Sequence, residues 1–362
     1  MTVHRAIRVL ATAAMVFGVS ACGGGGAGSA SSTLPATGAS QGSASATFVL
    51  KIPPKSSGTS ARGSRAKYLT SAVQGISFSV TQAGNPLVYG YNFYALTPQS
   101  TYCTGGGTQA LVCTLAVQAP PGADTFTVTT YDGTTAYAYI ISTASITQTI
   151  TAQSSNTINI TTNGVVTILQ LALDDPFPAT GASSTTAVRA QAADADGNLI
   201  IGPFDMPLVL TDSDASGATS LSATSLAAPG ALSLSYTGAA LSGGATIQVE
   251  AQSPSSASNG GPFIASAGFF PGASGAYTQP SILYFGQPTA AAQTLTAVVA
   301  GPAQTVSVTT GAPSSGNACS GIVSVSGTSP SFTVTPVAAG SCNLVVSGTS
   351  GYQTTTPVLV SP

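Results

Sequence analysis

Residues 111–131 read LVCTLAVQAPPGADTFTVTTY, and this stretch decides the fold class. Apolar side chains occupy every second position of residues 111–119 and recur at alternate positions around Phe126 and Val128. A period of two is the pattern expected of a strand with one buried face. Between the two runs stands Pro120-Pro121-Gly122, a strong turn signal. The stretch therefore predicts two short strands joined by a turn.

The same alternation continues along the chain and divides it into regions. Short alternating runs separated by Gly, Pro, Asn and Ser turns predict a β-sandwich at 47–164, a second module at 165–252 and a third at 281–362. Residues 136–142 and 146–152 are expected to be separate strands of the first module. Residues 253–280 begin with a run of Ser, Gly and Asn, which predicts a linker.

The composition supports an all-β chain. Only 5% of the 362 residues are charged, 43% are hydrophobic, and there is no Trp. Long helices favour Leu, Glu, Lys and Arg, whereas strands favour β-branched residues. The charges are segregated, because five basic residues lie between Lys51 and Lys67 and Arg189 is the only one after them. The basic run predicts an exposed segment, with contact to an anionic envelope surface as the functional alternative.

Three motifs carry a family resemblance. Residues 121–128 (PGADTFTV) resemble the closing hairpin of transthyretin-like and carboxypeptidase-regulatory-like modules. Residues 194–200 (DADGNLI) resemble the inter-strand turn of bacterial immunoglobulin-like modules of the invasin type, and 332–335 with 340–346 resemble the last strands of such repeats. The resemblance implies an all-β fold of tandem immunoglobulin-like or transthyretin-like β-sandwich modules. It does not supply a function.

The amino terminus predicts the location of the protein. Arg5 and Arg8 precede an uncharged apolar stretch at 9–19, which is followed by Val-Ser-Ala and Cys22. This layout is that of a cleaved signal, and its end resembles the lipobox of bacterial lipoproteins. The resemblance implies a signal peptide at 1–21, acyl chains such as palmitate on Cys22, and membrane anchoring outside the cytoplasm. In a Gram-negative host, Gly23 implies the outer membrane or cell surface. An ordinary secretory signal is the alternative.

The residues that follow Cys22 fit an anchored and exported protein. Residues 22–46 are rich in Gly, Ser and Ala and predict a flexible tether. The four cysteines that remain beyond Cys22 can pair in an oxidising compartment. Because each local pair falls within one predicted module, we expect the disulfides Cys103–Cys113 and Cys319–Cys342.

Few residues suit catalysis. His4 is the only histidine and lies in the signal segment, and Glu250 is the only glutamate. His-based triads and His-ligated metal sites are therefore excluded from the mature chain. The remaining enzyme class is a carboxylate-dependent hydrolase, which needs two facing carboxylates. Nucleic-acid binding is not expected, because the chain is net acidic and carries no recognised motif.

Two clusters are candidate ligand sites. Four side chains have oxygen atoms suited to a calcium loop: Asp194, Asp196, Asn198 and Asp205. Their spacing departs from that of an EF-hand, and an ordinary turn explains the first three. Calcium is thus the only candidate cofactor. Tyr89, Tyr91 and Phe93 share one strand face. We expect this face to be core, with a sugar-stacking platform as the alternative.

The sequence favours a non-enzymatic cell-surface lipoprotein whose tandem modules serve as a spacer, adhesion or binding scaffold. Its expected partners are the membrane, through the lipid, and an envelope polysaccharide or surface protein. The alternatives are a carbohydrate-binding surface protein and a hydrolase.

Overall fold

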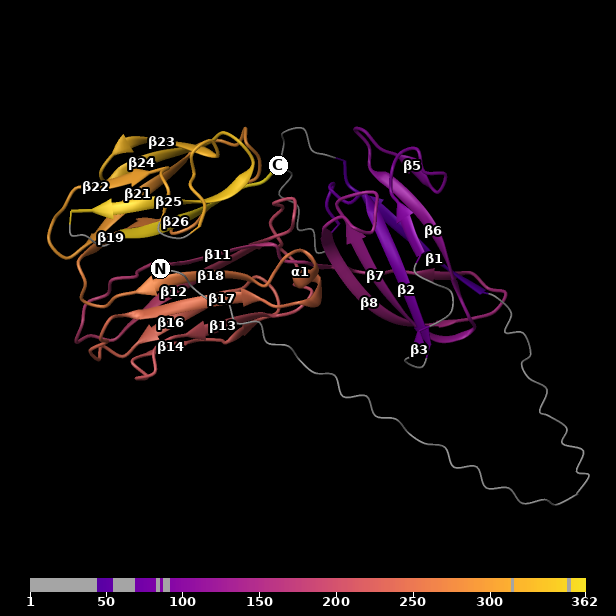
Figure 1. Ribbon diagram of the computed structural model, residues 1–362, viewed down its shortest axis with the longest axis horizontal. Coiled ribbons are helices and arrows are strands. Elements are labelled where there is room, and N and C mark those ends of the chain that lie inside the picture. The colour runs from indigo at the N-terminus through magenta and orange to yellow at the C-terminus, as the bar shows by residue number, and fades with distance from the viewer. Residues whose placement is uncertain (1–43, 55–68, 83–84, 87–91, 314–315, 350–352) are drawn as a thin grey trace, which may run out of the picture. The chain divides into compact units, whose positions relative to one another are not determined.

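The computed structural model describes residues 44–54, 69–82, 85–86, 92–313, 316–349 and 353–362. Almost all regular structure in these residues is β, arranged as immunoglobulin-like sandwiches in tandem (Figure 1). Successive β-sandwiches are built from β1–β10, β11–β18 and β19–β26, here called the first, second and third modules.

The first module packs the sheet β5-β6-β1-β9 against the sheet β10-β8-β7-β2-β3, to which β4 also pairs through β2. Alternation explains its strands, since β1 and β6 bury every second side chain. Phe48, Phe78 and Phe126 meet in the centre, with ring centroids 4.5 and 5.4 Å apart. The strands are β1 Ala44–Ile52, β2 Gly75–Gln82, β3 Asn85–Pro86, β4 Asn92–Ala95, β5 Cys103–Gly105, β6 Leu111–Ala119, β7 Gly122–Tyr131, β8 Ile140–Ile150, β9 Asn156–Ile158 and β10 Asn163–Gly164.

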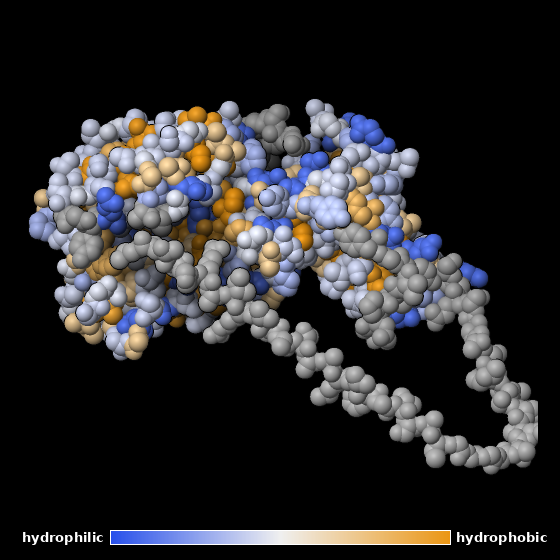
Figure 2. Space-filling view, in the orientation of Figure 1, coloured by the Kyte–Doolittle hydropathy of each residue, from blue (hydrophilic) through white to orange (hydrophobic). Residues whose placement is uncertain are grey.

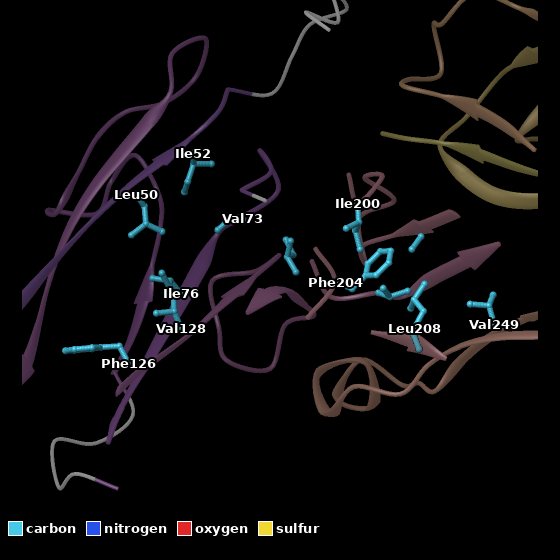
Figure 3. Close-up of a cluster of buried hydrophobic side chains, with 14 of the residues drawn as sticks. Leu50, Ile52, Val73, Ile76, Phe126, Val128, Ile200, Phe204, Leu208 and Val249 are labelled. Atoms are coloured by element: carbon cyan, nitrogen blue, oxygen red, sulfur yellow. The ribbon is translucent and has the colours of Figure 1, made fainter. Parts of the chain in front are cut away.

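The second module packs β11-β12-β16-β14 against β15-β13-β17-β18. Figure 3 shows Leu50, Ile76 and Phe126 of the first module and Phe204 and Leu208 of the second, all buried and all members of one hydrophobic cluster. Its elements are β11 Ile168–Leu173, β12 Ser184–Ala193, β13 Leu208–Asp212, β14 Thr219–Leu221, β15 Ser225–Leu226, β16 Leu232–Tyr236, β17 Ala245–Ala251, α1 Pro254–Ser258 and β18 Phe263–Phe269.

The third module packs β19-β21-β24-β23 against β20-β26-β25-β22 around its own core, which includes Phe285, Leu295 and Leu344. Its strands are β19 Gly275–Gln279, β20 Leu283–Phe285, β21 Gln293–Ala300, β22 Val306–Thr309, β23 Val323–Thr328, β24 Ser331–Pro336, β25 Gly340–Gly348 and β26 Gln353–Val360.

Residues 253–280 are not a linker, and this expectation is wrong. Ser253 caps α1 by accepting a hydrogen bond from the Ser256 N–H, and Pro254 begins the helix. Strand β18 then pairs with β17 along its whole length, and β19 pairs with β21 of the third module. The Ser- and Asn-rich composition that suggests a linker is also that of a capped helix.

Three smaller expectations also need correction. Residues 121–128 do not pair with the preceding strand, because β6 and β7 lie in different sheets; β7 instead forms an antiparallel hairpin with β8 and also pairs with β2. The strands expected at 136–142 and 146–152 are one strand, β8, because its pairing with β7 runs on through residues 140–150. Strand β1 begins at Ala44, which shortens the expected tether because Ala44 pairs with Ala119.

The surface reflects the scarcity of charge. Figure 2 shows apolar residues interspersed with weakly polar ones over the face in view. Exposed large apolar side chains include Tyr137, Tyr139, Ile201 and Ile264. No helix among the described residues is long and apolar enough to cross a membrane.

Candidate functional sites

The predicted lipid anchor and two of the predicted aromatic residues lie outside the described residues. These are Cys22, with the signal segment and the tether up to residue 43, and Tyr89 and Tyr91. Phe93 is half-buried on β4, with its ring 5.5 Å from that of Tyr131. The deeper aromatic contact of β4 is made by the next residue, Tyr94, whose ring lies 5.9 Å from Phe78 and whose hydroxyl donates to the Ala116 carbonyl.

Both predicted disulfides are present in the structure. Cys103 and Cys113 lie directly opposite each other on β5 and β6. Cys319 precedes β23 and is joined to Cys342 on β25, which ties the two sheets of the third module. Cys113, Cys319 and Cys342 are almost fully buried, so these bonds belong to the cores. Their presence fits an oxidising compartment.

The turn at Asp194 is built by side-chain hydrogen bonds. Asp194 is fully buried, and its Oδ1 accepts from the backbone N–H groups of Asp196 and Asn198, at 3.1 and 2.8 Å. The Asn198 amide also donates to the Asp194 carboxylate. A carboxylate that receives several N–H groups organises a turn between β12 and Leu199, as the motif implied.

The four candidate calcium ligands do not all belong to one turn. Asp205 is not part of the turn: its N–H donates to the Gly164 carbonyl, in the connection between the first two modules. Burial raises the pKa of the Asp205 carboxyl, although hydrogen bonds from Ser253 and Met206 oppose the shift. Within the described residues no three His, Cys, Asp or Glu side chains gather as a metal site.

A second pair of carboxylates also organises a turn. The Thr219 hydroxyl donates to Asp212 at 2.6 Å and is 3.1 Å from Asp214, so one hydroxyl bridges the two. Hydrogen bonds from the Ser216 hydroxyl and the Thr219 N–H lower the pKa of Asp214 to about 2. An inverting or retaining hydrolase needs one carboxyl that holds a proton. The lowered pKa of Asp214 does not suit that role.

One buried carboxylate was missed from the sequence. Asp124 is fully buried near the start of β7, where it lies opposite Gln82 of β2. Burial raises the pKa of Asp124, with an opposing contribution from Gln82 on the neighbouring strand β2. The signal was available, because Asp124, Phe126 and Val128 share one strand face by the period of two.

The one cation after Lys67 lies at a cavity. Arg189 on β12 forms a bidentate ion pair with Asp174, the shortest N–O distance being 2.6 Å, and the Ser281 hydroxyl also donates to Asp174. Burial favours a raised pKa for Asp174, but the hydrogen bonds of Arg189 and Ser281 and the Arg189 charge outweigh it, so its pKa is lowered. The three residues line a cavity of about 700 Å³.

Specific hydrogen bonds join the first module to the second. The Asn259 amide, just after α1, accepts from the Ile140 N–H at 2.8 Å and donates to the Ile140 carbonyl at 2.7 Å. It thereby supplies the two bonds that a neighbouring strand residue makes. Ser256 of α1, which is fully buried, donates to the Val166 carbonyl at 2.9 Å.

The second and third modules are joined in the same way. Gln170 on β11 donates to the Val358 carbonyl at 2.9 Å and lies 3.1 Å from the Ser341 hydroxyl. The Ser361 hydroxyl donates to the Gly197 carbonyl at 2.7 Å, next to the Asp194 turn. Each bond includes a backbone carbonyl or a buried side chain, so each fixes a particular alignment of the two modules.

Comparison with known proteins returns similar folds and no family. No protein-family model matches the chain, and no curated protein matches it. Among solved structures, the Escherichia coli adhesin FdeC is 15% identical, with 88% of this chain and 96% of that chain covered and a TM-score of 0.21. The Yersinia pseudotuberculosis adhesin InvE is 17% identical with a TM-score of 0.20; 53% of this chain and 58% of that chain are covered, little more than half its length.

A third similar structure comprises domains 4 and 5 of the S-layer protein SbsC. It is 15% identical, with 55% of this chain and all of that chain covered and a TM-score of 0.19. Similarities of this extent say nothing about what this chain binds.

Proposed function

We propose that this chain is a non-enzymatic scaffold of the bacterial cell surface, anchored by lipid on Cys22, whose tandem modules hold a binding surface away from the membrane. The observation that carries the proposal is the pair of hydrogen-bonded junctions. Asn259 binds both backbone groups of Ile140, and Gln170 and Ser361 bind backbone carbonyls of the neighbouring module. Hydrogen bonds of this kind hold neighbouring modules in a fixed arrangement, which a spacer requires.

The sites described above support a structural role for the carboxylates. Asp194, Asp212 and Asp214 accept hydrogen bonds within their own turns, and Asp174 is paired with Arg189. Groups used in this way hold loops in place. The two disulfides support an extracytoplasmic location, because such bonds persist in oxidising compartments.

Membrane anchoring is tested on the full chain. Cells that produce the Cys22→Ser variant are expected to release the protein from the membrane fraction, because the acyl chains provide the attachment. Wild type should remain with membranes after a high-salt wash and partition into detergent. Retention of the variant under the same wash contradicts lipid anchoring.

The scaffold role is tested by adhesion. Cells that display the wild-type protein should adhere to a panel of envelope polysaccharides and surface proteins more strongly than cells that display none. Protease treatment of intact cells should remove both the protein and the adhesion. Hydrolysis of glycan, ester or peptide substrates by the purified full chain contradicts a non-enzymatic role.

Carbohydrate binding is a second candidate, favoured by exposed tyrosines. Tyr137 is fully exposed and Tyr139 is 56% exposed, both in the loop between β7 and β8. Aromatic faces that lie open to water are suited to stacking on sugar rings. Tyr137→Ala should reduce binding on a glycan array, and Tyr284→Ala, which changes a tyrosine of the third module, serves as the control. Equal glycan binding by both variants argues against this role.

A further inference from the structure

The edge of β12 carries a gap in its strand pairing. Strand β16 pairs with β12 only as far as Val188, which lies opposite Leu232. At the other end of the gap, Ala193 of β12 forms an isolated antiparallel bridge with Leu199. Arg189, Ala190 and Gln191 therefore have no strand partner on this side, and they line the cavity of about 700 Å³. We call this gap the β12 slot.

The slot presents backbone hydrogen-bonding groups. The carbonyls of Ala187 and Ala193 bond toward β11, to Asp174 and Thr167, so the odd-numbered residues of β12 face β11. In an antiparallel pair the alternate residues face the other side, and Ala192 does so, since its carbonyl accepts from the Ile200 N–H. The N–H and carbonyl of Ala190 consequently point into the slot.

The walls of the slot are aliphatic. Leu232 and Ile200 close its two ends, and Ile201 and Ile282 contribute further apolar surface to the cavity. Ile201 is 58% exposed, which leaves an apolar side chain open to water at the mouth. Between Val188 and Ala192 the edge spans about 13 Å, the length of three to four extended residues.

Arg189 adds a charge to the mouth of the slot. Its Nε and Nη2 donate hydrogen bonds to Asp174, and the remaining guanidinium nitrogen, Nη1, can donate another. Its side chain is 59% exposed, and it is the only cation after Lys67 in an otherwise acidic region. Asp174 already offsets much of this charge, so what Arg189 offers an acidic group is the hydrogen bond of Nη1 beside the open strand edge.

We propose that the β12 slot binds an extended acidic segment of a partner protein by strand addition. The segment's backbone pairs with Ala190, its aliphatic side chains contact Ile201 and Ile282, and a carboxylate contacts Arg189. Sugar stacking is disfavoured because the cavity is lined by aliphatic rather than aromatic side chains. The proposal rests on the binding role proposed above, for which it names a class of partner, and it is independent of the lipid anchor.

The test measures binding of peptides to the purified full chain. The probes are capped three-residue peptides with Val, Ile or Thr at the central position and Glu at position 1 or 3. Matched control peptides carry Gln in place of Glu, or an N-methyl group at the central residue. We expect saturable binding of Glu peptides, about tenfold weaker binding of Gln peptides, and loss of binding on N-methylation.

Protein variants locate the binding. Ala190→Pro removes an N–H that β11 does not use, so the strand should fold and peptide binding should be lost. Arg189→Gln should abolish the preference for Glu over Gln, and Arg189→Lys should retain part of it. Thermal unfolding confirms that each variant is folded, and Arg189→Gln keeps the test decisive should Ala190→Pro fail to fold.

The opposing results are equally defined. Equal binding of N-methylated peptides, unchanged binding by a folded Ala190→Pro variant, absence of binding across the peptide set, or binding of hexuronate oligosaccharides in place of peptides each overturns the proposal. None of these results bears on membrane anchoring or adhesion, so a failure here is distinguishable from a failure of the scaffold role.

Discussion

Replacing Asn259 with Ala should loosen the junction between the first and second modules. The side chain makes two hydrogen bonds to Ile140, of 2.8 and 2.7 Å, and both are lost in the variant. A net contribution of ~0.5–1.5 kcal/mol for each bond gives a loss of about 1–3 kcal/mol. Since ~1.4 kcal/mol corresponds to a factor of ten, local opening at the junction should become about 5 to 150 times more frequent.

Hydrogen exchange with mass spectrometry measures this opening directly. Peptides that cover Ile140 and the end of α1 should exchange faster in Asn259→Ala, whereas the third module should be unchanged. Ser258→Ala is the matched control, because its hydroxyl bonds only to the Pro254 carbonyl within the same helix. Exchange within twofold of wild type at Ile140, or an equal effect of Ser258→Ala, would refute the junction argument.

Removing the Cys319–Cys342 bond by a double Ala substitution should cost more stability than removing Cys103–Cys113. The loops span 23 and 10 residues of sequence separation, and the loop-entropy relation gives about 3.4 and 2.7 kcal/mol; urea unfolding of both variants checks the order, and the reverse order contradicts it. Asp124→Asn should be more stable than wild type at pH 7, and the difference should shrink toward pH 3. The pKa of Asp124 is raised by burial, so its folded state loses stability as pH rises from the usual Asp value through the raised one. A difference that does not change with pH contradicts this.

Local pattern was enough to predict the strands of the cores. The alternation of Leu111–Ala119 gave the bounds of that strand, because it buries one face against a facing sheet. The disulfides were also predictable from locality, since each pair lies within one module. These features depend on neighbours in sequence or on a single sandwich.

The junctions and the slot depend on contacts that local pattern does not encode. Asn259 and Ile140 are 119 residues apart, and nothing in SPSSASNGG distinguishes a helix that fastens two modules from a flexible linker. The charge count singled out Arg189, but its cavity is completed by Ser281 and Ile282 from the beginning of the third module. The sequence also gave no sign that Asp205 is separate from the Asp194 turn and that its N–H donates to the Gly164 carbonyl instead.

The pairing of strand edges connects these observations. Exposed strand edges are commonly protected by charged side chains. Only 5% of the residues of this chain are charged, so few charged side chains are available for this. Three strands gain short pairings instead: β9 lies parallel to β1, β20 lies parallel to β26, and Asn259 bonds to β8 beyond β10. Against this background, the unpaired edge at Ala190 stands beside the single cation of the region. The gap at Ala190 differs from the free outer edges of terminal strands such as β14 and β18, because it interrupts the pairing of an inner strand, and the N-methylated peptide tests whether a partner strand fills it.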